Sequence, residues 1–187
     1  NPNANNQVLD LQKNGATIYV GGQFSTIGGQ ARVGIAAVDA GSGLPTAWNP
    51  TADNLVYEMR LDGNLVYVCG TFTAIGGQPR NRIAALDATT GAATAWDPNA
   101  NARVSVMELY GHDVVVGGDF TFVGGQTRHY LALIEGATGL ANFTWDPNLG
   151  SSVYAVDRLG IRLCVGGNPS TGAMREITRP TTGAATQ

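Results

Sequence analysis

An internal repeat constrains the fold of this chain more than any other feature of its sequence. An Asn-Pro or Asp-Pro pair returns four times, and its prolines are spaced 48, 48 and 49 residues apart at Pro2, Pro50, Pro98 and Pro147. The first three units each close on a tryptophan, at Trp48, Trp96 and Trp145. Self-similarity at a period of roughly 20 to 50 residues is typical of solenoids and propellers. The sequence therefore predicts a single repeat region over residues 1–187, divided into units 1–48, 49–96, 97–145 and a shortened 146–187.

The second unit shows the order of signals that the units share. Its apolar stretches predict four short strands, separated by turns, at residues 55–61, 65–70, 83–87 and 92–96. Phe72 and the doublet Gly76-Gly77 predict a loop between the second and third strands. Helix is not expected, because Gly and Pro recur every few residues and no long stretch carries a 3.6-residue apolar period. The predicted fold class is all-β, made of four-stranded antiparallel units.

Four-stranded units in tandem are typical of a β-propeller, because one unit is too small to bury both of its faces without neighbours. We expect four blades arranged radially, with the first strand of each blade innermost. The alternatives are a closed four-blade ring, part of a larger propeller, and two chains that complete one ring. The chain starts at Asn1 without an initiator methionine or a signal-peptide pattern and stops at Gln187, where the next tryptophan is due. We therefore expect the chain to be cut at a repeat boundary, and the alternatives are the removal of a signal, the removal of an upstream part, and a segment that was chosen to begin here.

Residues 65–77, 82–91 and 96–98 carry a resemblance to a known family. They resemble the delta-60 type β-propeller repeats, which are kelch-like and galactose-oxidase-like propeller repeats of unknown function. The resemblance covers the first three units, where residues 21–24 and 117–120 are in register with 69–72. It implies a β-propeller within a large secreted or surface-anchored protein, and it brings no catalytic motif. The kelch pattern of tyrosine and tryptophan is only partly present, and the Gly-His and Trp-Asp pairs of WD repeats are absent as a set.

The fourth unit departs from this pattern. Pro169 stands where the other units carry phenylalanine, and the second glycine doublet is missing. Five fewer residues separate Gly167 from Thr182 than separate Gly118 from Thr138 in the third unit. The fourth unit is therefore predicted to have a shortened connection between its second and third strands, or a distorted third strand.

Residues that recur in every unit are explained by packing and turn geometry, whereas ligand chemistry is expected where the units disagree. Structural roles are therefore assigned to the glycines that end the second strands, where backbones approach closely, and to the aromatic residues between blades. These repeat residues are Gly22, Gly70, Gly118, Gly167, Phe24, Phe72, Phe120, Trp48, Trp96 and Trp145.

Three arginines recur as well, each two residues after a glutamine, at Arg32, Arg80 and Arg128. One hypothesis is a ring of polar groups that binds an anion or a sugar. The other, which the recurrence favours, is a structural arginine that donates hydrogen bonds to turn carbonyls.

Both histidines, His112 and His129, lie in the third unit and are the clearest departures from the repeat, so we include them as candidate ligand-binding residues. No acidic cluster of metal-ligand spacing surrounds them, and neither a metal nor a cofactor is predicted.

No Gly-x-Ser-x-Gly or similar context predicts a nucleophile, so no catalytic residue is assigned. A pair of carboxylates could act on glycosides if the fold brought two of them together, and the candidates are Asp53, Glu58, Asp113 and Asp119.

Composition excludes several classes of partner. Charged residues make up only 13% of the chain, its formal net charge is −3 and Lys13 is its sole lysine, so nucleic acid is not an expected partner. No apolar run approaches the roughly 18 residues of a membrane span. Cys69 and Cys164 lie at non-equivalent positions of different units and give no disulfide framework. The low lysine content and the sequon at Asn142 favour a secreted or cell-surface location.

These observations favour a non-catalytic structural or binding module that presents loops to a protein or a glycan, or that assembles with further blades or copies. Two alternatives remain, a carbohydrate-active or other hydrolytic propeller enzyme and a lectin-like module. An enzyme should show a polar cluster unique to one or two blades, whereas a lectin should show the same polar and aromatic pocket in every blade.

Overall fold

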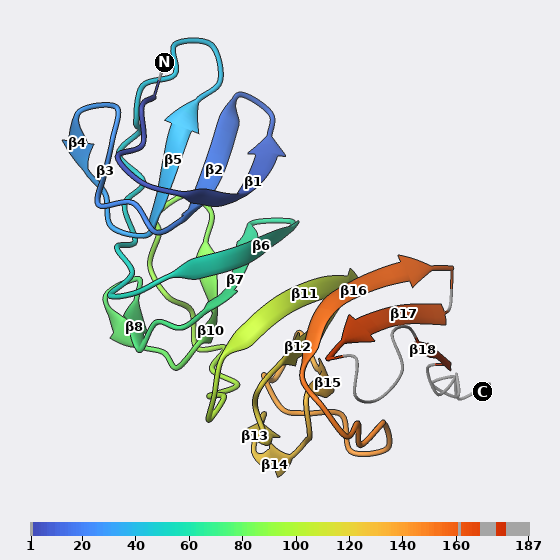
Figure 1. Cartoon of the computed structure of the whole chain (residues 1–187). Helices are drawn as coiled ribbons and strands as arrows, with labels where there is room; N and C mark the ends of the chain where they lie inside the picture. The colour runs from blue at the N-terminus through green and yellow to red at the C-terminus, as the bar shows by residue number, and fades with distance from the viewer. Residues whose placement is uncertain (1, 161, 169–174, 179–187) are drawn as a thin grey trace, which may run out of the picture.

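The computed structural model describes residues 2–160, 162–168 and 175–178, and every regular element in these ranges is a β-strand. The strands form one antiparallel three-stranded sheet per repeat, and Figure 1 shows the four sheets following one another along a curved row. We call these sheets blades 1 to 4.

Each of the first three blades combines its sheet with a short outer hairpin. Blade 1 contains β1 (Val8–Asn14), β2 (Thr17–Gly22) and β5 (Ile35–Asp39), with the hairpin β3 (Thr26–Ile27) and β4 (Gln30–Ala31). Blade 2 contains β6 (Val56–Asp62), β7 (Leu65–Gly70) and β10 (Ile83–Asp87), with β8 (Ala74–Ile75) and β9 (Gln78–Pro79). Blade 3 contains β11 (Val104–Tyr110), β12 (Asp113–Gly118) and β15 (Leu131–Ile134), with β13 (Phe122–Val123) and β14 (Gln126–Thr127). Blade 4 contains β16 (Val153–Leu159), β17 (Arg162–Gly167) and β18 (Arg175–Thr178).

Glycine doublets explain the outer hairpins, which the sequence predicted only as loops. In blade 2, Ile75 pairs with Gln78, so Gly76-Gly77 is a two-residue connection. Both glycines have positive φ, 60° and 77°. This is the backbone that a type I′ hairpin turn requires and that glycine adopts without strain.

The predicted fourth strand is reduced to a single bridge in each of the first three blades. In blade 2 the bridge joins Leu86 to Ala93, and the Thr94 N–H donates to the Ala85 carbonyl at 2.9 Å. Pairing does not extend further because the Thr94 carbonyl accepts a hydrogen bond from the Arg80 guanidinium, while the Ala92 N–H donates to the Thr90 hydroxyl. The segment then turns away from the sheet toward Trp96.

The core lies between the blades. Each blade has a leading face, turned toward the preceding blade, and a trailing face, turned toward the following one. Val56 and Met59 on the leading face of blade 2 are fully buried in one cluster with Tyr19 and Trp48 from the trailing face of blade 1. The same arrangement joins blade 2 to blade 3. The first strands of successive blades, β1, β6, β11 and β16, contact one another in order and therefore form the inner side of the row.

A β-bulge near the start of every first strand fixes how neighbouring blades meet. The register shifts between Val56 and Glu58 in β6, and at the equivalent place in the other three first strands. The amide N–H of Met59 donates to Asp10 of the preceding blade at 2.7 Å, and that of Met107 donates to Glu58 at 2.6 Å. An acid of one blade thus satisfies a backbone donor of the next, at a point where the inner edge of the strand has no strand partner.

The predictions for the fourth unit fall mostly on residues outside the described ranges, including Pro169 and the connection between β17 and β18. β18 does pair with β17, from Val165↔Arg175 to Arg162↔Thr178. Among the residues described, none forms a helix that could span a membrane.

Candidate binding site at the channel mouth

The four strand-ending glycines lie where the second strand approaches the first. A side chain on Gly70 would collide with the backbone carbonyl of Leu55, and side chains on Gly22, Gly118 and Gly167 would meet the equivalent carbonyls. These glycines do not have positive φ, so backbone conformation does not explain why glycine is needed there. Glycine is needed because the two backbones approach closely at the bulge.

The repeated aromatic residues lie in the interior. The Trp48 indole N–H donates to the Asp87 carbonyl of the next blade at 3.0 Å, and the Trp96 indole N–H donates to the Glu135 carbonyl at 3.0 Å. The rings of Trp48 and Trp96 each contact a tyrosine edge-on. Trp145, Phe24, Phe72 and Phe120 are also buried. Trp48 and Trp96 therefore each connect their own blade to the end of the third strand of the following blade.

The three repeated arginines join the outer hairpin to the bridge segment of the same blade. Arg80 donates to the carbonyls of Pro79 at 2.7 Å and Thr94 at 2.5 Å. Arg32 and Arg128 make the equivalent bonds and add one to a glutamine side chain. The terminal guanidinium nitrogens named here are occupied within the blade, whereas the buried Nε of each of the three arginines has no hydrogen-bond partner among the described residues. Whether the arginines also bind a ligand stays a prediction.

The structure does not bring the two histidines together. His112 lies in the turn before β12, and its Nδ1 is 2.8 Å from the carboxylate of Asp62 in blade 2. His129 follows β14, beyond the other end of β12, and its ring contacts Tyr130. The hydrogen bond to the Asp62 carboxylate, together with its charge, raises the pKa of the fully exposed His112. A ligand site at either histidine stays a prediction.

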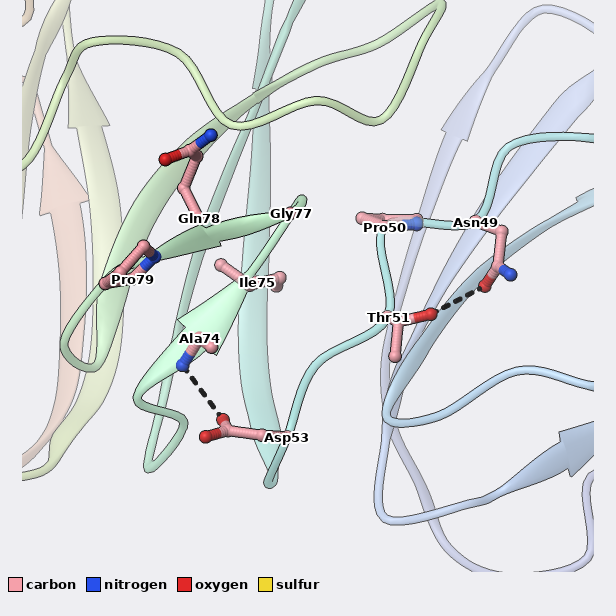
Figure 2. Close-up of a pocket in the computed structure, with 9 residues that line it drawn as sticks. All are labelled: Asn49, Pro50, Thr51, Asp53, Ala74, Ile75, Gly77, Gln78 and Pro79. Carbon is pink, nitrogen blue, oxygen red and sulfur yellow. Dashed lines mark hydrogen bonds between the residues drawn. The ribbon is translucent and has the colours of Figure 1, made fainter.

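A hollow of about 520 Å³ lies between the loop 49–53 and the outer hairpin of blade 2 (Figure 2). Asp53 is the charged residue of its lining, and its carboxylate already accepts hydrogen bonds from the N–H groups of Thr73 and Ala74 and from the Thr73 hydroxyl. Asn5 and Asn101 cap the hairpins of blades 1 and 3 in the same way. The role of Asp53 in this hollow is therefore that of a hairpin cap, which blades 1 and 3 repeat. It does not mark a binding site specific to blade 2.

Charged side chains gather instead along the inner side of the row. Arg60 of β6 lies 2.6 Å from Glu58 on its own strand and 3.1 Å from Glu108 on β11. Burial raises the pKa of Glu58, although the bond from Met107 and the charge of Arg60 act in the opposite direction. Asp10 and Asp157 lie on β1 and β16, so the inner side carries more acidic than basic groups.

Where the inner strands begin lies a polar and aromatic group made of Tyr57, Arg103, Asp119 and Tyr154. We call it the channel-mouth cluster, because this end of the inner strands is where the central channel of a propeller would open. The Arg103 guanidinium lies 6.0 Å from the ring centre of Tyr57 and 5.5 Å from that of Tyr154. Its Nε is 2.8 Å from an Asp119 carboxylate oxygen. The cluster therefore spans three blades, because Tyr57 belongs to blade 2, Arg103 and Asp119 to blade 3, and Tyr154 to blade 4.

The cluster is specific to these blades and open to solvent. The bulged position holds Leu9, Tyr57, Ser105 and Tyr154 in blades 1 to 4. Tyr154 is 48% exposed, and the side chains of Arg103 and Asp119 are each about a third exposed. Among the described residues, the buried hydroxyl of Ser105, at the bulge of the blade between the two tyrosines, has no hydrogen-bond partner, and neither has the buried hydroxyl of Thr71.

Sequence reasoning missed this cluster. The principle that function lies where the repeats disagree applies to it, but the sequence does not show that Tyr57 and Tyr154, which share one repeat position in blades 2 and 4, lie beside Arg103 of blade 3. Only the bulge and the packing of three first strands bring them together. Asp119 was considered as a glycosidase carboxylate, but it is paired with Arg103.

The other candidate carboxylates are spread over the molecule. Asp53 caps a hairpin, Glu58 pairs with Arg60, and Asp113 accepts a hydrogen bond from the Gly136 N–H. In the part of the chain that the structure describes, no group of three or more His, Cys, Asp and Glu side chains is arranged to hold a metal ion.

Cys69 and Cys164 are free, and burial raises the pKa of the Cys69 thiol well above its usual value.

Comparison with known proteins agrees with this architecture. Residues 61–89 match the model of a domain of unknown function, DUF5122, described as a β-propeller. The fold is similar to the crystal structure of the computationally designed Ika4 protein, with a TM-score of 0.66 and 13% identity over 93% of this chain and 92% of that chain. It is also similar to the designed Ika8 protein, with a TM-score of 0.60 and 14% identity over 92% of this chain and 46% of that one. The WD40 β-propeller domain of Doa1 matches with a TM-score of 0.65 and 14% identity over 95% of this chain and 52% of that one.

This chain therefore spans most of Ika4 but only about half of the Ika8 and Doa1 chains. No curated protein matches its sequence. The repeated antiparallel sheets and the structural similarities define the class of the protein: it is an all-β protein with the β-propeller fold, and its residues 61–89 are similar to a β-propeller domain of unknown function.

Proposed function

We propose that this chain is a non-catalytic binding module of a secreted or cell-surface protein, built from propeller repeats of the delta-60 type, and that its channel-mouth cluster contacts a protein ligand. One observation carries the proposal: a solvent-open group of two tyrosines, an arginine and an aspartate is specific to blades 2 to 4, whereas the residues that recur in each blade are engaged within the fold. Tyrosine and arginine are enriched at the centres of protein interfaces and dominate their binding energy.

The charges near the cluster indicate which ligand it favours. The inner strands β1, β6, β11 and β16 carry five acidic residues, Asp10, Glu58, Asp62, Glu108 and Asp157, against three basic ones, Lys13, Arg60 and Arg158. Arg103 is paired with Asp119 and adds no net charge. A segment with basic side chains would meet an acidic surface and two tyrosine rings, which attract cations through their faces.

The proposal is tested by fluorescence anisotropy with a labelled arginine- and lysine-rich peptide, an acidic peptide of equal length and a glycan array. We expect the basic peptide to bind and to bind more weakly as salt rises. Replacing Tyr154→Ala should weaken binding about fivefold or more, which is the effect of losing roughly 1 kcal/mol at an interface. Leu44→Ser, on an exposed side chain that lies outside the cluster, is the matched control.

Failure of the basic peptide to bind, or binding that Tyr57→Ala and Tyr154→Ala leave unchanged, would contradict the proposal. Binding to glycans that both variants abolish would instead support the lectin-like alternative.

A further inference from the structure

The leading face of blade 1 is an apolar surface that no described part of the chain covers. Val8 is 41% exposed and Leu11 59% exposed on β1. With Ile18, Val20 and Val38 they line a hollow of about 360 Å³. Two exposed branched side chains beside an apolar hollow are costly for a free surface, since each buried methylene is worth about 0.8 kcal/mol.

The same face is covered in the next two blades. Val56 and Met59 of blade 2, and Val104 and Met107 of blade 3, hold the positions of Val8 and Leu11 and are 0% exposed. The trailing face of the preceding blade covers them through a tyrosine, a tryptophan, an isoleucine and an alanine. The face of blade 1 therefore has the shape and chemistry of a surface made to receive the trailing face of another blade.

Blade 4 offers a trailing side at the other end of the row. On β16, Ala155 and Asp157 are exposed, and they hold the positions of Glu58 and Arg60. In the described junction between blades 2 and 3, the residue at the Arg60 position reaches Glu108 on the next first strand, at 3.1 Å. If blade 4 of one molecule met blade 1 of another, the equivalent pair would be Asp157 and Gln12, a carboxylate acceptor facing an amide donor.

We propose that the leading face of blade 1 binds a second copy of this chain, head to tail, so that blade 4 of each molecule packs on blade 1 of the other and two rows close into one ring. The junction is equivalent in position to the interfaces that join blades 1, 2 and 3, but Cys164 of blade 4 holds the position of the covering tyrosines Tyr19 and Tyr67. Head-to-tail contacts form a ring only when their rotations close, so two reciprocal junctions require that the four blades of one molecule turn through half of the ring.

Light scattering on a size-exclusion column tests the proposal with the intact chain. The expected mass is twice the 19.4 kDa of the single chain. Leu11→Asp places a charge in the apolar junction and should return the mass to that of one chain. Leu140→Asp, on a side chain that is 55% exposed outside this face, is the matched control and should leave the mass doubled. Because Leu11 is already mostly exposed, circular dichroism should show both variants folded.

A charge series at Gln12 identifies the partner surface. Gln12→Arg should tighten the pair several-fold by facing Asp157, and Gln12→Glu should weaken it. The double variant Gln12→Glu with Asp157→Arg should restore the affinity, a coupling that arises only if the two positions meet.

A wild-type chain that stays at 19.4 kDa up to high concentration would overturn the proposal. So would a doubled mass that Leu11→Asp does not change. A dimer that Leu11→Asp disrupts but that shows no coupling between positions 12 and 157 would overturn the head-to-tail arrangement.

Discussion

At the scale of single residues, one side chain per blade decides whether the outer hairpin is held. Asn5, Asp53 and Asn101 accept hydrogen bonds from two backbone N–H groups at the start of their hairpins. Blade 4 has Gly150 at this position, and its sequence also lacks the glycine doublet of the hairpin. The fourth unit therefore lacks both the capping side chain and the glycine doublet that forms the hairpin turn in the other three units.

Replacing Asp53→Ala should lower the free energy of unfolding by about 1–2 kcal/mol, because two backbone donors and one hydroxyl lose their acceptor. Asp53→Asn should be nearly neutral at pH 7, since asparagine performs this role in blades 1 and 3. Urea unfolding followed by tryptophan fluorescence measures both. Equal stability of the alanine variant and the wild type would contradict the capping role.

Asp53 should also make the free energy of unfolding depend on pH. Burial acts to raise the pKa of Asp53, but the bonds from Thr73 and Ala74 outweigh it and hold the pKa below its usual value. Its contribution to stability is therefore present above the usual pKa and is lost as the pH falls through the lowered one. Asp53→Asn should lose less stability than the wild type on acidification below about pH 4.

His112 offers a spectroscopic prediction at this scale. The hydrogen bond and charge of Asp62 raise its pKa, so an NMR titration of the imidazole C–H signals should show a midpoint above the ordinary value of about 6.5. In Asp62→Asn the midpoint should fall back toward that value. The favourable contact is present at low pH and fades as the pH rises through the raised pKa. An identical midpoint in both proteins would rule out the contact.

At the scale of strands, the bulge and the glycine opposite it determine how two strands of a blade meet. A side chain on Gly70 would run into the Leu55 carbonyl, whereas one on Gly41 would make only an ordinary contact at 3.5 Å.

Gly70→Ala should therefore cost about 2 kcal/mol or more of the free energy of unfolding, within the range measured for overpacked cores, and Gly41→Ala should cost less than about 0.5 kcal/mol. Chemical denaturation of the two variants in parallel separates a steric requirement from the general flexibility of glycine. Similar costs for both would mean that the close approach is not what selects glycine at position 70.

The sequence was sufficient to predict the strands that its periodicity marks. The first three strands of the second unit were placed within one residue of β6, β7 and β10, because alternating and apolar stretches bounded by glycine turns specify them locally. The fourth strand failed as a prediction because its end depends on Arg80, a long-range donor that competes for the Thr94 carbonyl. The channel-mouth cluster could not be predicted, since its members meet only after three blades have packed.

At the scale of the whole molecule, the repeated residues hold the fold together, and our proposal assigns binding to the channel-mouth cluster, which is not repeated in every blade. Arg80 represents the first group, because it is mostly buried and satisfies two carbonyls of its own blade. Arg103 represents the second, because its ion pair with Asp119 lies at the surface. Exposed ion pairs contribute only about 0–1 kcal/mol, whereas hydrogen bonds from a buried charged group are worth about 1.5–3 kcal/mol each.

The most direct test of this division is the thermal unfolding midpoint of Arg80→Ala measured beside that of Arg103→Ala. We predict that Arg80→Ala lowers the midpoint by at least about 4 °C and that Arg103→Ala changes it by less than about 2 °C, since 1 kcal/mol corresponds to roughly 2–4 °C in a chain of this size. A larger loss for Arg103→Ala than for Arg80→Ala would contradict the account, because the channel-mouth cluster would then be part of what holds the blades together.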